Sequence, residues 1–162
     1  MPRPKVTIRA AVAGDASALA SLSTFVQELH FGERPDLFKR VDEAGVTQWF
    51  TNTLASGHAR AWIADVDGGP VGYALVVEHC RPDGPFCYER RWHEVDQLGV
   101  HPTHRSLGVA RELLDYVVRL AGERGVSSVE LNTWSFNTTS HQAFQRCGFV
   151  AKNVRFERST RQ

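Results

Sequence analysis

Apolar residues recur along this chain with two different periods, and the changes between them predict an α+β protein. Alternation at every second residue is typical of strands, whereas apolar residues three or four positions apart mark one face of a helix. The predicted strands are residues 6–11, 59–66, 70–79, 93–100, 128–134 and 150–156. The predicted helices are residues 15–29, 43–54, 110–125 and 138–147.

Local signals predict where several of these elements end. Asp15 is placed as the N-cap of the first helix, and Gly32 and Pro35 are expected to break the chain after it. The turn at residues 67–69, Asp-Gly-Gly, joins two strands into a hairpin. Gly148 is expected to cap the end of the last helix.

Length and composition are those of one ordinary globular domain. The chain has 162 residues, of which 42% are hydrophobic and 23% charged, with a formal net charge of +1. We therefore expect a single domain over residues 1–162. The near-neutral charge argues against nucleic acid as a partner, because its binding needs a basic face. No apolar run approaches the roughly 20 residues of a membrane span, and residues 1–10 lack a signal-peptide stretch, so we expect a cytoplasmic protein with no membrane partner.

The cysteines and histidines predict neither a disulfide framework nor a metal site. Cys80, Cys87 and Cys147 are odd in number and lack CxxC spacing. Cys80 and Cys87 could face each other across a hairpin, but we expect reduced thiols. His101 and His104 lie on a proline-containing turn without a nearby carboxylate or cysteine cluster, so no metal is expected there.

Residues 101–114, HPTHRSLGVARELL, carry the most informative pattern in the chain. They follow a predicted strand and open an amphipathic helix, with Gly108 and Ala110 where that helix would begin. A loop of this kind points several unpaired backbone N–H groups and the positive end of the helix dipole at one place. The pattern therefore predicts an anion site, most often one for phosphate.

Gly99 interrupts the predicted strand just before this loop. A glycine inside a strand often marks a β-bulge or a close backbone approach by a ligand. A bulge here would leave N–H and C=O groups around Leu98 and Val100 free to bind an amide-rich chain. A pyrophosphate held by the loop and a peptide-like arm along the strand together describe coenzyme A.

Two motifs make the chain resemble the GNAT superfamily of acyl-CoA-dependent N-acyltransferases over residues 6–156. LGVHPTHRSLGVARELL, residues 98–114, matches the family's strand, V-x-P, and [Q/R]-x-x-G-x-[G/A] at a helix start. Asn137-x-x-Ser140-x-x-x-Phe144-x-x-x-Gly148-Phe149 resembles N-x-x-A-x-x-x-Y-x-x-x-G-F. The resemblance implies a GNAT fold, whose central mixed, mostly antiparallel sheet has six or seven strands flanked by about four helices.

The resemblance also implies acetyl-CoA as co-substrate, with no metal. The backbone of Leu98, Gly99 and Val100 would bind the pantetheine arm, while the side chain of Leu98 can still belong to the core. Asn137 and Ser140 would contact the pantetheine side of the cofactor, and Asn137 can cap its helix at the same time. The backbone N–H groups that would hold the pyrophosphate are those of Arg105, Ser106, Leu107, Gly108, Val109 and Ala110.

Three positions depart from the family pattern. Ser106 stands where glycine is common, and Leu107 stands where a basic or polar residue is common, although neither change blocks backbone binding. Phe144 stands where many relatives carry a tyrosine thought to protonate the departing CoA thiolate. Because phenylalanine has no proton to give, we expect Phe144 to be a cofactor contact only.

The family mechanism is direct attack by an amine on the acetyl thioester, which requires a group that accepts the amine's proton. Glu94 and Asp96 are spaced by two on the predicted strand and so share a face. Either could be the base, and the sequence does not separate them. Alternatively, either could be an exposed carboxylate or form an ion pair with Arg90, Arg91 or His93. Repulsion between the two carboxylates could raise one pKa, and a backbone N–H near Leu98 would stabilise the oxyanion.

The acceptor is expected to be a primary amine of a small molecule or a peptide, with the small molecule favoured by the acidic pair and the neutral charge. Residues 30–40 and 81–89 are the expected specificity segments, with Phe31, Leu37 and Phe38 as candidate walls, and His30 as an alternative base. Relatives are often dimers, so a homodimer is possible. The competing interpretation is a non-catalytic acyl-CoA-binding or regulatory module, which the absence of a tyrosine at Phe144 keeps open.

Overall fold

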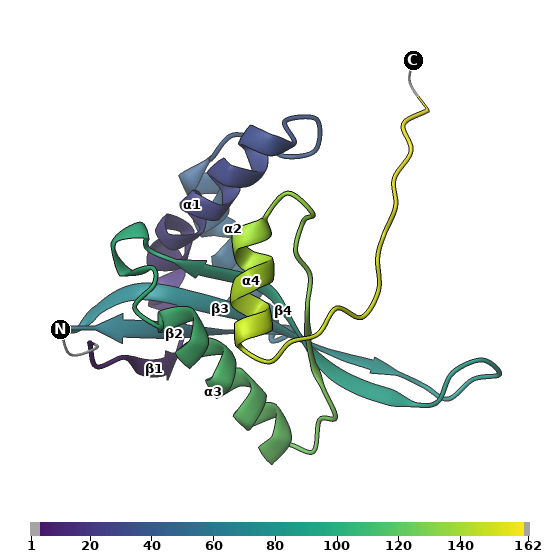
Figure 1. The fold of residues 1–162 in the computed structure, drawn as a ribbon. Coiled ribbons are helices and arrows are strands. Elements are labelled where there is room, and N and C mark those ends of the chain that lie inside the picture. The colour runs from purple at the N-terminus through teal and green to yellow at the C-terminus, as the bar shows by residue number, and fades with distance from the viewer. Residues whose placement is uncertain (1–3, 161–162) are drawn as a thin grey trace. The chain divides into compact units, whose positions relative to one another are not determined.

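The computed structural model describes residues 4–160, which form two compact units (Figure 1). The first unit ends at Asn132 and the second begins at Thr133, and the expectation of one domain over the whole chain stays a prediction. The first unit contains, in chain order, β1 (Thr7–Ala10), the 3₁₀ helix η1 (Ala13–Asp15), α1 (Ala16–Glu33), α2 (Glu43–Ser56), β2 (Ala59–Val66), β3 (Gly69–Arg81), β4 (Arg90–Val100), the 3₁₀ helix η2 (Pro102–His104), α3 (Val109–Glu123) and β5 (Val129–Leu131). The second unit contains α4 (Thr138–Arg146).

The strands form one five-stranded sheet in the order β1-β2-β3-β4-β5. β1 to β4 pair antiparallel with their neighbours, and β5 pairs parallel with β4. The crossover from β4 to β5 runs through α3, as a parallel pair requires. The α+β class and the mixed, mostly antiparallel sheet are therefore confirmed, but the prediction of six or seven strands is wrong for the described residues.

The missing strand is the one predicted at residues 150–156, which form no strand in the structure. Their apolar side chains alternate as a strand would, yet Val150, Val154 and Phe156 are 86%, 75% and 92% exposed. Alternation predicts a strand only where a neighbouring edge supplies backbone hydrogen bonds and a surface to cover one face. The strand predicted at residues 128–134 shortens for a related reason, because only Val129–Leu131 pairs with β4.

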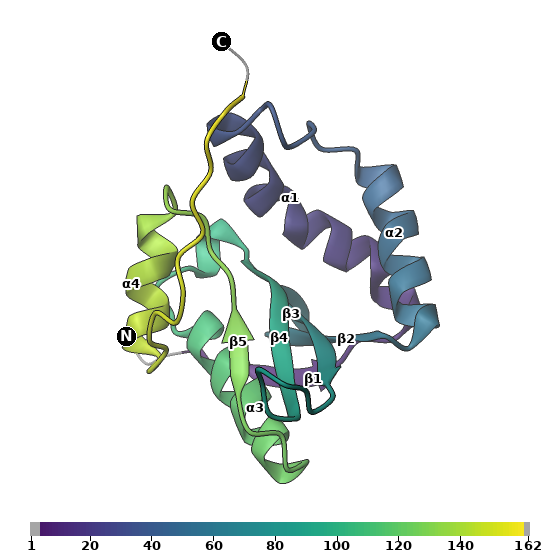
Figure 2. The ribbon, with the colours of Figure 1, turned by 90° about the vertical axis from the view of Figure 1, so that its right-hand side faces the viewer.

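Helices cover both faces of the sheet in the first unit, with α1 and α2 on one face and α3 on the other (Figure 2). Strand residues alternate between these faces, so Tyr73 and Leu75 join the cluster under α1 and α2, which includes Leu19 and Phe50. The opposite face packs against the fully buried stripe of α3, made by Val109, Leu113, Leu114, Val117 and Ala121. These two cores hold β3 and β4 in place, and the candidate site lies on those strands.

The predicted helix ends hold in part. Asp15 occupies the position before α1, but its carboxylate accepts hydrogen bonds from the backbone N–H of Val12 and the guanidinium of Arg9 and does not cap α1. α1 continues through Gly32 to Glu33 and stops at Arg34, the residue before Pro35. Proline disfavours helical geometry in the residue that precedes it, whereas a single glycine is tolerated. Gly148 has φ of +86° after α4, as expected of a capping glycine.

Candidate active site

A β-bulge lies in β4 at Asp96, three residues before the position at which the sequence placed it. Gln97 pairs with Leu75 of β3 and Val95 pairs with Val76, so Asp96 has no partner across the ladder. An unpaired bulge residue bends its strand and re-aims the neighbouring side chains. The bulge therefore leaves Asp96, a carboxylate residue, without a partner on β3. It does not lie at Gly99, where the sequence predicted it.

Gly99 pairs regularly with Tyr73 and has a different reason to be glycine. A Cβ atom at this position would lie 2.6 Å from Cε1 of Tyr73 and 3.2 Å from the carbonyl oxygen of Leu22 in α1. The close approach at Gly99 is thus made by a buried aromatic ring and a helix backbone of the same chain. The predicted bulge at Gly99 is wrong, and the close approach by a ligand stays a prediction.

β4 and β5 separate shortly after they pair. Their parallel register covers only residues 93–95 of β4, against Val129–Leu131. Among the described residues no strand pairs with this edge of β4 from residue 96 to residue 100, while β3 occupies the other edge through Val100. The backbone groups of an open edge are available to a ligand that carries amides. This is the edge on which the sequence placed Leu98, Gly99 and Val100 as pantetheine contacts.

The predicted anion loop connects this edge to α3. η2 follows β4 directly, Ser106 has φ of +64°, and Gly108 has φ of +91° at the N-cap of α3. No acceptor among the described residues takes the backbone N–H groups of residues 106–110. Since α3 begins at Val109, these groups and the positive end of the helix dipole are available to an anion.

Arg105 is the one predicted member of the loop whose backbone N–H is already used. It donates to the carbonyl oxygen of Pro102 at 3.3 Å. The Nε of Arg105 also donates to the carbonyl oxygen of Val100 at 3.2 Å, which ties the loop to the end of β4. The backbone contacts available to a pyrophosphate therefore narrow to Ser106, Leu107, Gly108, Val109 and Ala110.

The two left-handed residues of the loop give a paired prediction. Ser106→Gly relieves a φ that costs a side chain about 1–2 kcal/mol, against a smaller entropic loss, and should raise the free energy of unfolding by about 0.5 kcal/mol with CoA affinity retained. Gly108→Ala imposes the same strain. It should lower the free energy of unfolding by about 1 kcal/mol and weaken CoA binding. Urea unfolding and CoA titration check both. Equal changes in the free energy of unfolding and in CoA affinity for the two variants would contradict the assigned loop geometry.

The two candidate carboxylates have different surroundings. Oε2 of Glu94 lies 2.9 Å from Nε2 of His79, and Oε1 accepts a hydrogen bond from Nδ2 of Asn132 at 2.7 Å. His79 in turn stacks on Trp92 at 5.0 Å between ring centroids. The ion pairs that the sequence offered for Glu94, with Arg90, Arg91 or His93, do not form, because Arg90 pairs with Glu130, and Arg91 and His93 face Glu78.

Asp96 is exposed and has no hydrogen-bond or ion-pair partner among residues 4–160. Desolvation by its surroundings raises the pKa of Asp96 above its ordinary value, and the charge of Glu94 raises it further, while His79 opposes the shift. In the acidic pair, the residue whose pKa is raised, as expected for one of the two, is therefore Asp96. An unpaired carboxylate with a raised pKa is better suited to accept a proton than one held by two donors.

Tyr73 and Gln97 extend this group beneath the surface, and the sequence did not identify them. The fully buried hydroxyl of Tyr73 donates to Oε1 of Gln97 at 2.9 Å, directly after the bulge residue. Burial raises the pKa of Tyr73, and Asp96 raises it further, so this hydroxyl keeps its proton. His79 and Asn132 were missed as well, because the register that brings them to Glu94 is visible only in the folded sheet.

The second motif lies in the second unit and is described there alone. Oδ1 of Asn137 accepts a hydrogen bond from the backbone N–H of Ser140 at 3.2 Å, which makes Asn137 the N-cap of α4. Phe144 is half-buried and packs against Phe149, with 6.4 Å between ring centroids. The capping role of Asn137 is confirmed, and the cofactor contacts of Asn137, Ser140 and Phe144 stay predictions.

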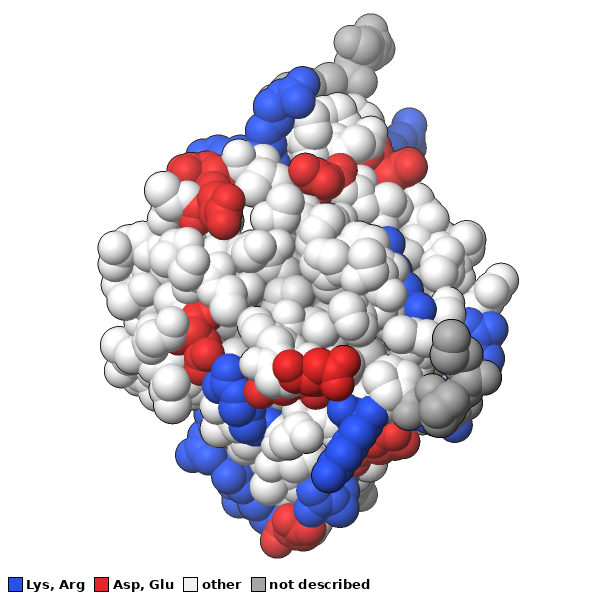
Figure 3. All heavy atoms as spheres, turned by 90° about the vertical axis from the view of Figure 1, so that its left-hand side faces the viewer, with Lys and Arg blue, Asp and Glu red and all other residues white. Residues whose placement is uncertain are grey.

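Charged side chains of both signs are present on the surface of the described residues (Figure 3). On the face drawn in Figure 3, acidic and basic side chains are interspersed, and no continuous basic stripe crosses that face. Within residues 4–160 no helix is both long and apolar enough to cross a membrane. No group of three or more His, Cys, Asp or Glu side chains in that range could hold a metal ion.

A mostly antiparallel sheet that opens between β4 and β5, followed by a loop with free backbone N–H groups at the start of α3, is the arrangement that the resemblance to the GNAT superfamily implies. The chain belongs to the acetyltransferase (GNAT) family, whose sequence profile matches residues 23–149. This match covers both motifs and all the strands from β2 onward. The identification of the chain as a member of the GNAT superfamily from its motifs is thus confirmed.

Individual relatives are distant. N-acetyltransferase family 8 member 2 of Rattus norvegicus is 26% identical over 110 residues, 68% of this chain and 45% of that protein. The chain thus spans less than half the length of that curated relative. The BH1408 protein from Bacillus halodurans, solved as a tetramutant, superposes with a TM-score of 0.89 at 21% identity, over 94% of this chain and 99% of that one. Aminoglycoside N-acetyltransferase AAC(6')-Iy in complex with CoA gives a TM-score of 0.75 at 22% identity, over 99% of both chains.

Proposed function

We propose that this protein transfers the acetyl group of acetyl-CoA to a primary amine of a small molecule or peptide, with Asp96 as the general base. The observation that carries the proposal is the bulge of β4, which presents an unpaired carboxylate beside an open strand edge. The cofactor and the proton acceptor then share one strand. That arrangement supports transfer chemistry more strongly than binding alone.

The first unit supplies most of the surface for acetyl-CoA. The amides of the pantetheine arm would pair with the backbone of Leu98 and Val100 along the open edge of β4. The pyrophosphate would accept hydrogen bonds from the N–H groups of residues 106–110 at the start of α3. A solved relative with the same fold contains CoA, which supports this cofactor class.

The reaction is then a direct displacement at the thioester. The amine nitrogen forms a bond to the carbonyl carbon, its proton passes to the carboxylate of Asp96, and the carbon–sulfur bond breaks to release the CoA thiolate. A backbone N–H near Leu98 stabilises the oxyanion of the tetrahedral intermediate. Phe144 supplies no proton, so the thiolate takes one from solvent.

Glu94 acts in this scheme through its charge and its contacts. Its carboxylate is held by His79 and Asn132, and its negative charge raises the pKa of Asp96. The pair of carboxylates also attracts a cationic amine to the bulge. We therefore assign Glu94 as a positioning residue and Asp96 as the base.

The Glu94→Gln variant should shift the pH dependence of the reaction. Removing a negative charge next to Asp96 lowers the pKa of Asp96, so the base stays ionised to lower pH. The acidic limb of the kcat/KM profile is expected to move to lower pH than in the wild type. Gln keeps an amide oxygen for Asn132. A limb that does not move, or that moves to higher pH, would contradict the assignment of Asp96.

The last turn of α1 and the segment that follows it offer walls for the acceptor site. The rings of His30 and Phe38 lie 4.7 Å apart, and the guanidinium of Arg40 lies 4.7 Å from the ring of Phe31. These contacts order residues 30–40 into a defined surface, in which Leu37 is 52% exposed. A small cationic amine is the favoured acceptor, in keeping with the aminoglycoside named for one solved relative.

The alternative is a module that binds acyl-CoA without turnover. It rests on Phe144, which packs against Phe149 and has no hydroxyl at the position of the family's tyrosine. Thiol release from acetyl-CoA, followed over a panel of polyamines, aminoglycosides and peptides, separates the two functions. Amine-dependent release supports the acetyltransferase. Tight CoA binding with no release on any amine supports the module.

A further inference from the structure

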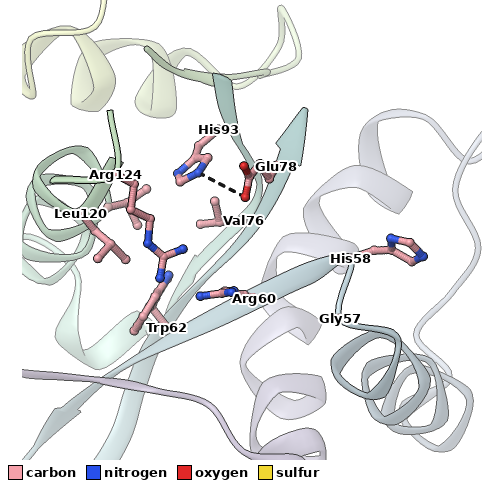
Figure 4. Close-up of a pocket in the computed structure, with 10 residues that line it drawn as sticks. Gly57, His58, Arg60, Trp62, Val76, Glu78, His93, Leu120 and Arg124 are labelled. Atoms are coloured by element: carbon pink, nitrogen blue, oxygen red, sulfur yellow. Dashed lines mark ion pairs between the residues drawn. The ribbon is translucent and has the colours of Figure 1, made fainter. Parts of the chain in front are cut away.

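A cationic pocket lies on the α3 side of the sheet, between α3 and strands β2 to β4 (Figure 4). Its volume is about 70 Å³, enough for a small polyatomic anion or a few water molecules. Arg124 reaches into it from the end of α3 and Arg60 from β2, and the ring of His93 faces the same space. Trp62 and Leu120 form apolar parts of the wall.

The charges around this pocket do not balance. Arg60 and Arg124 form no ion pair with any residue in the described range 4–160. Glu78, the one carboxylate in the lining, is paired with Arg91 outside it, and that contact lowers the pKa of Glu78 most, followed by the charges of His93 and Arg124. Two guanidinium groups therefore share a concave surface without a free counterion, an arrangement that favours an anion between them.

His93 adds a buried polar group to the same wall. It is only 4% exposed and is the one polar or charged residue in the buried set of the described chain. Its Nε2 lies 4.0 Å from Oε2 of Glu78, too far for a hydrogen bond. When protonated, His93 forms a long ion pair with Glu78 through this nitrogen, which makes no hydrogen bond and can donate to a ligand oxygen (Figure 4).

The pocket is distinct from the site proposed for CoA. The anion loop lies at the N-terminus of α3, whereas Arg124 follows its last residue, and 15 helical residues span about 22 Å. The carbonyl groups at the end of α3 accept hydrogen bonds from the backbone N–H groups of Arg124, Gly125 and Val126, which reduces their repulsion of an anion.

We propose that Arg60, Arg124 and His93 form a second anion site, which binds a phosphate group on the side of the sheet opposite the carboxylates of the transfer site. A tetrahedral dianion satisfies both guanidinium groups and places an oxygen against the imidazole. Its source is either inorganic phosphate or the phosphoryl group of a small phosphomonoester. The site stands independently of the proposed acetyl transfer.

Binding at this site should be linked to protonation of His93. Burial lowers the pKa of His93, as do the charges of Arg124, Arg91 and Arg60, whereas Glu78 raises it. On the neighbouring β5, Glu130 is paired with Arg90. A bound dianion raises the pKa of His93 and draws a proton into the pocket. Sulfate, which stays doubly charged, should therefore bind more tightly as the pH falls.

The test is titration of the full-length protein with inorganic phosphate and with glycerol phosphate, at constant ionic strength and with saturating CoA present. The ring signals of His93 are followed by nuclear magnetic resonance. We expect saturable shifts, a rise in the pKa of His93, and at least about tenfold weaker binding in Arg60→Gln and Arg124→Gln. Arg119→Gln is the matched control, because Arg119 lies on the same helix and pairs with Glu123 on the surface.

This titration measures binding and not turnover, so its result does not depend on whether the protein transfers an acetyl group. Tighter binding of either phosphate source identifies the natural ligand class and supports the site. Shifts that do not saturate, an equal loss in Arg119→Gln, or abolition of phosphate binding by CoA would overturn the proposal.

Discussion

The Asp96→Asn variant is expected to lose roughly 100- to 1,000-fold in kcat/KM for amine acetylation, with CoA affinity unchanged. Asparagine keeps the shape of the bulge residue but cannot accept the proton of an attacking ammonium. Asp96 has no hydrogen-bond or ion-pair partner among the described residues, so the change removes no structural contact. Steady-state kinetics with a fixed amine and isothermal titration with CoA measure the two quantities.

Stability should not fall in this variant. Folding raises the pKa of Asp96, so the ionised carboxylate is disfavoured in the native state, and the wild type loses stability as the pH rises through that raised value. The Asp96→Asn variant lacks this loss of stability. At neutral pH it should unfold at the same denaturant concentration as the wild type or at a higher one. Asp115→Asn, an exposed carboxylate on α3, is the matched control for kinetics. Equal effects of the two changes on kcat/KM would contradict the role of Asp96.

The second large effect is expected from Gly99→Ala, which should lower the free energy of unfolding by about 2 kcal/mol. The added Cβ would lie 2.6 Å from Cε1 of Tyr73, whose ring is fully buried and whose hydroxyl is tied to Gln97. The opposite side is closed by the carbonyl oxygen of Leu22 at 3.2 Å. Neither neighbour is the end of a flexible side chain, so the strand itself has to shift.

Gly122→Ala is the control for Gly99→Ala. Gly122 lies in α3 with no atom within 4 Å of an added Cβ, so alanine should stabilise the protein by about 0.5–1 kcal/mol. Chemical denaturation of both variants gives the comparison. A Gly99→Ala protein as stable as the wild type would contradict the packing of Tyr73 against β4.

Patterns confined to one element were predicted well from the sequence. The amphipathic helix α3 and the capping of α4 by Asn137 depend on residues a few positions apart, and both occur as expected. The predicted anion loop also depends on local backbone geometry, and the positive φ at Ser106 is a conformation that glycine adopts more readily than serine.

Features that depend on pairing between distant segments could not be predicted. The bulge at Asp96 follows from the register of β4 on β3, and the contact of Glu94 with His79 follows from the same register. Neither leaves a periodic trace in the sequence. Residues 150–156 show the converse, because they alternate in sequence and yet form no strand in the structure. The proposal of Asp96 over Glu94 as the base therefore rests on the fold and not on the sequence.

The most direct test of the central claim is incubation of the protein with acetyl-CoA labelled in the acetyl group and the best amine from the panel, followed by mass spectrometry of the amine. We expect a labelled amide on the amine, formed with an equal amount of free CoA by the wild type and strongly reduced with Asp96→Asn. Stoichiometric CoA binding with no labelled amide, or an equal yield of labelled amide from the Asp96→Asn variant, would contradict acetyl transfer with Asp96 as its base.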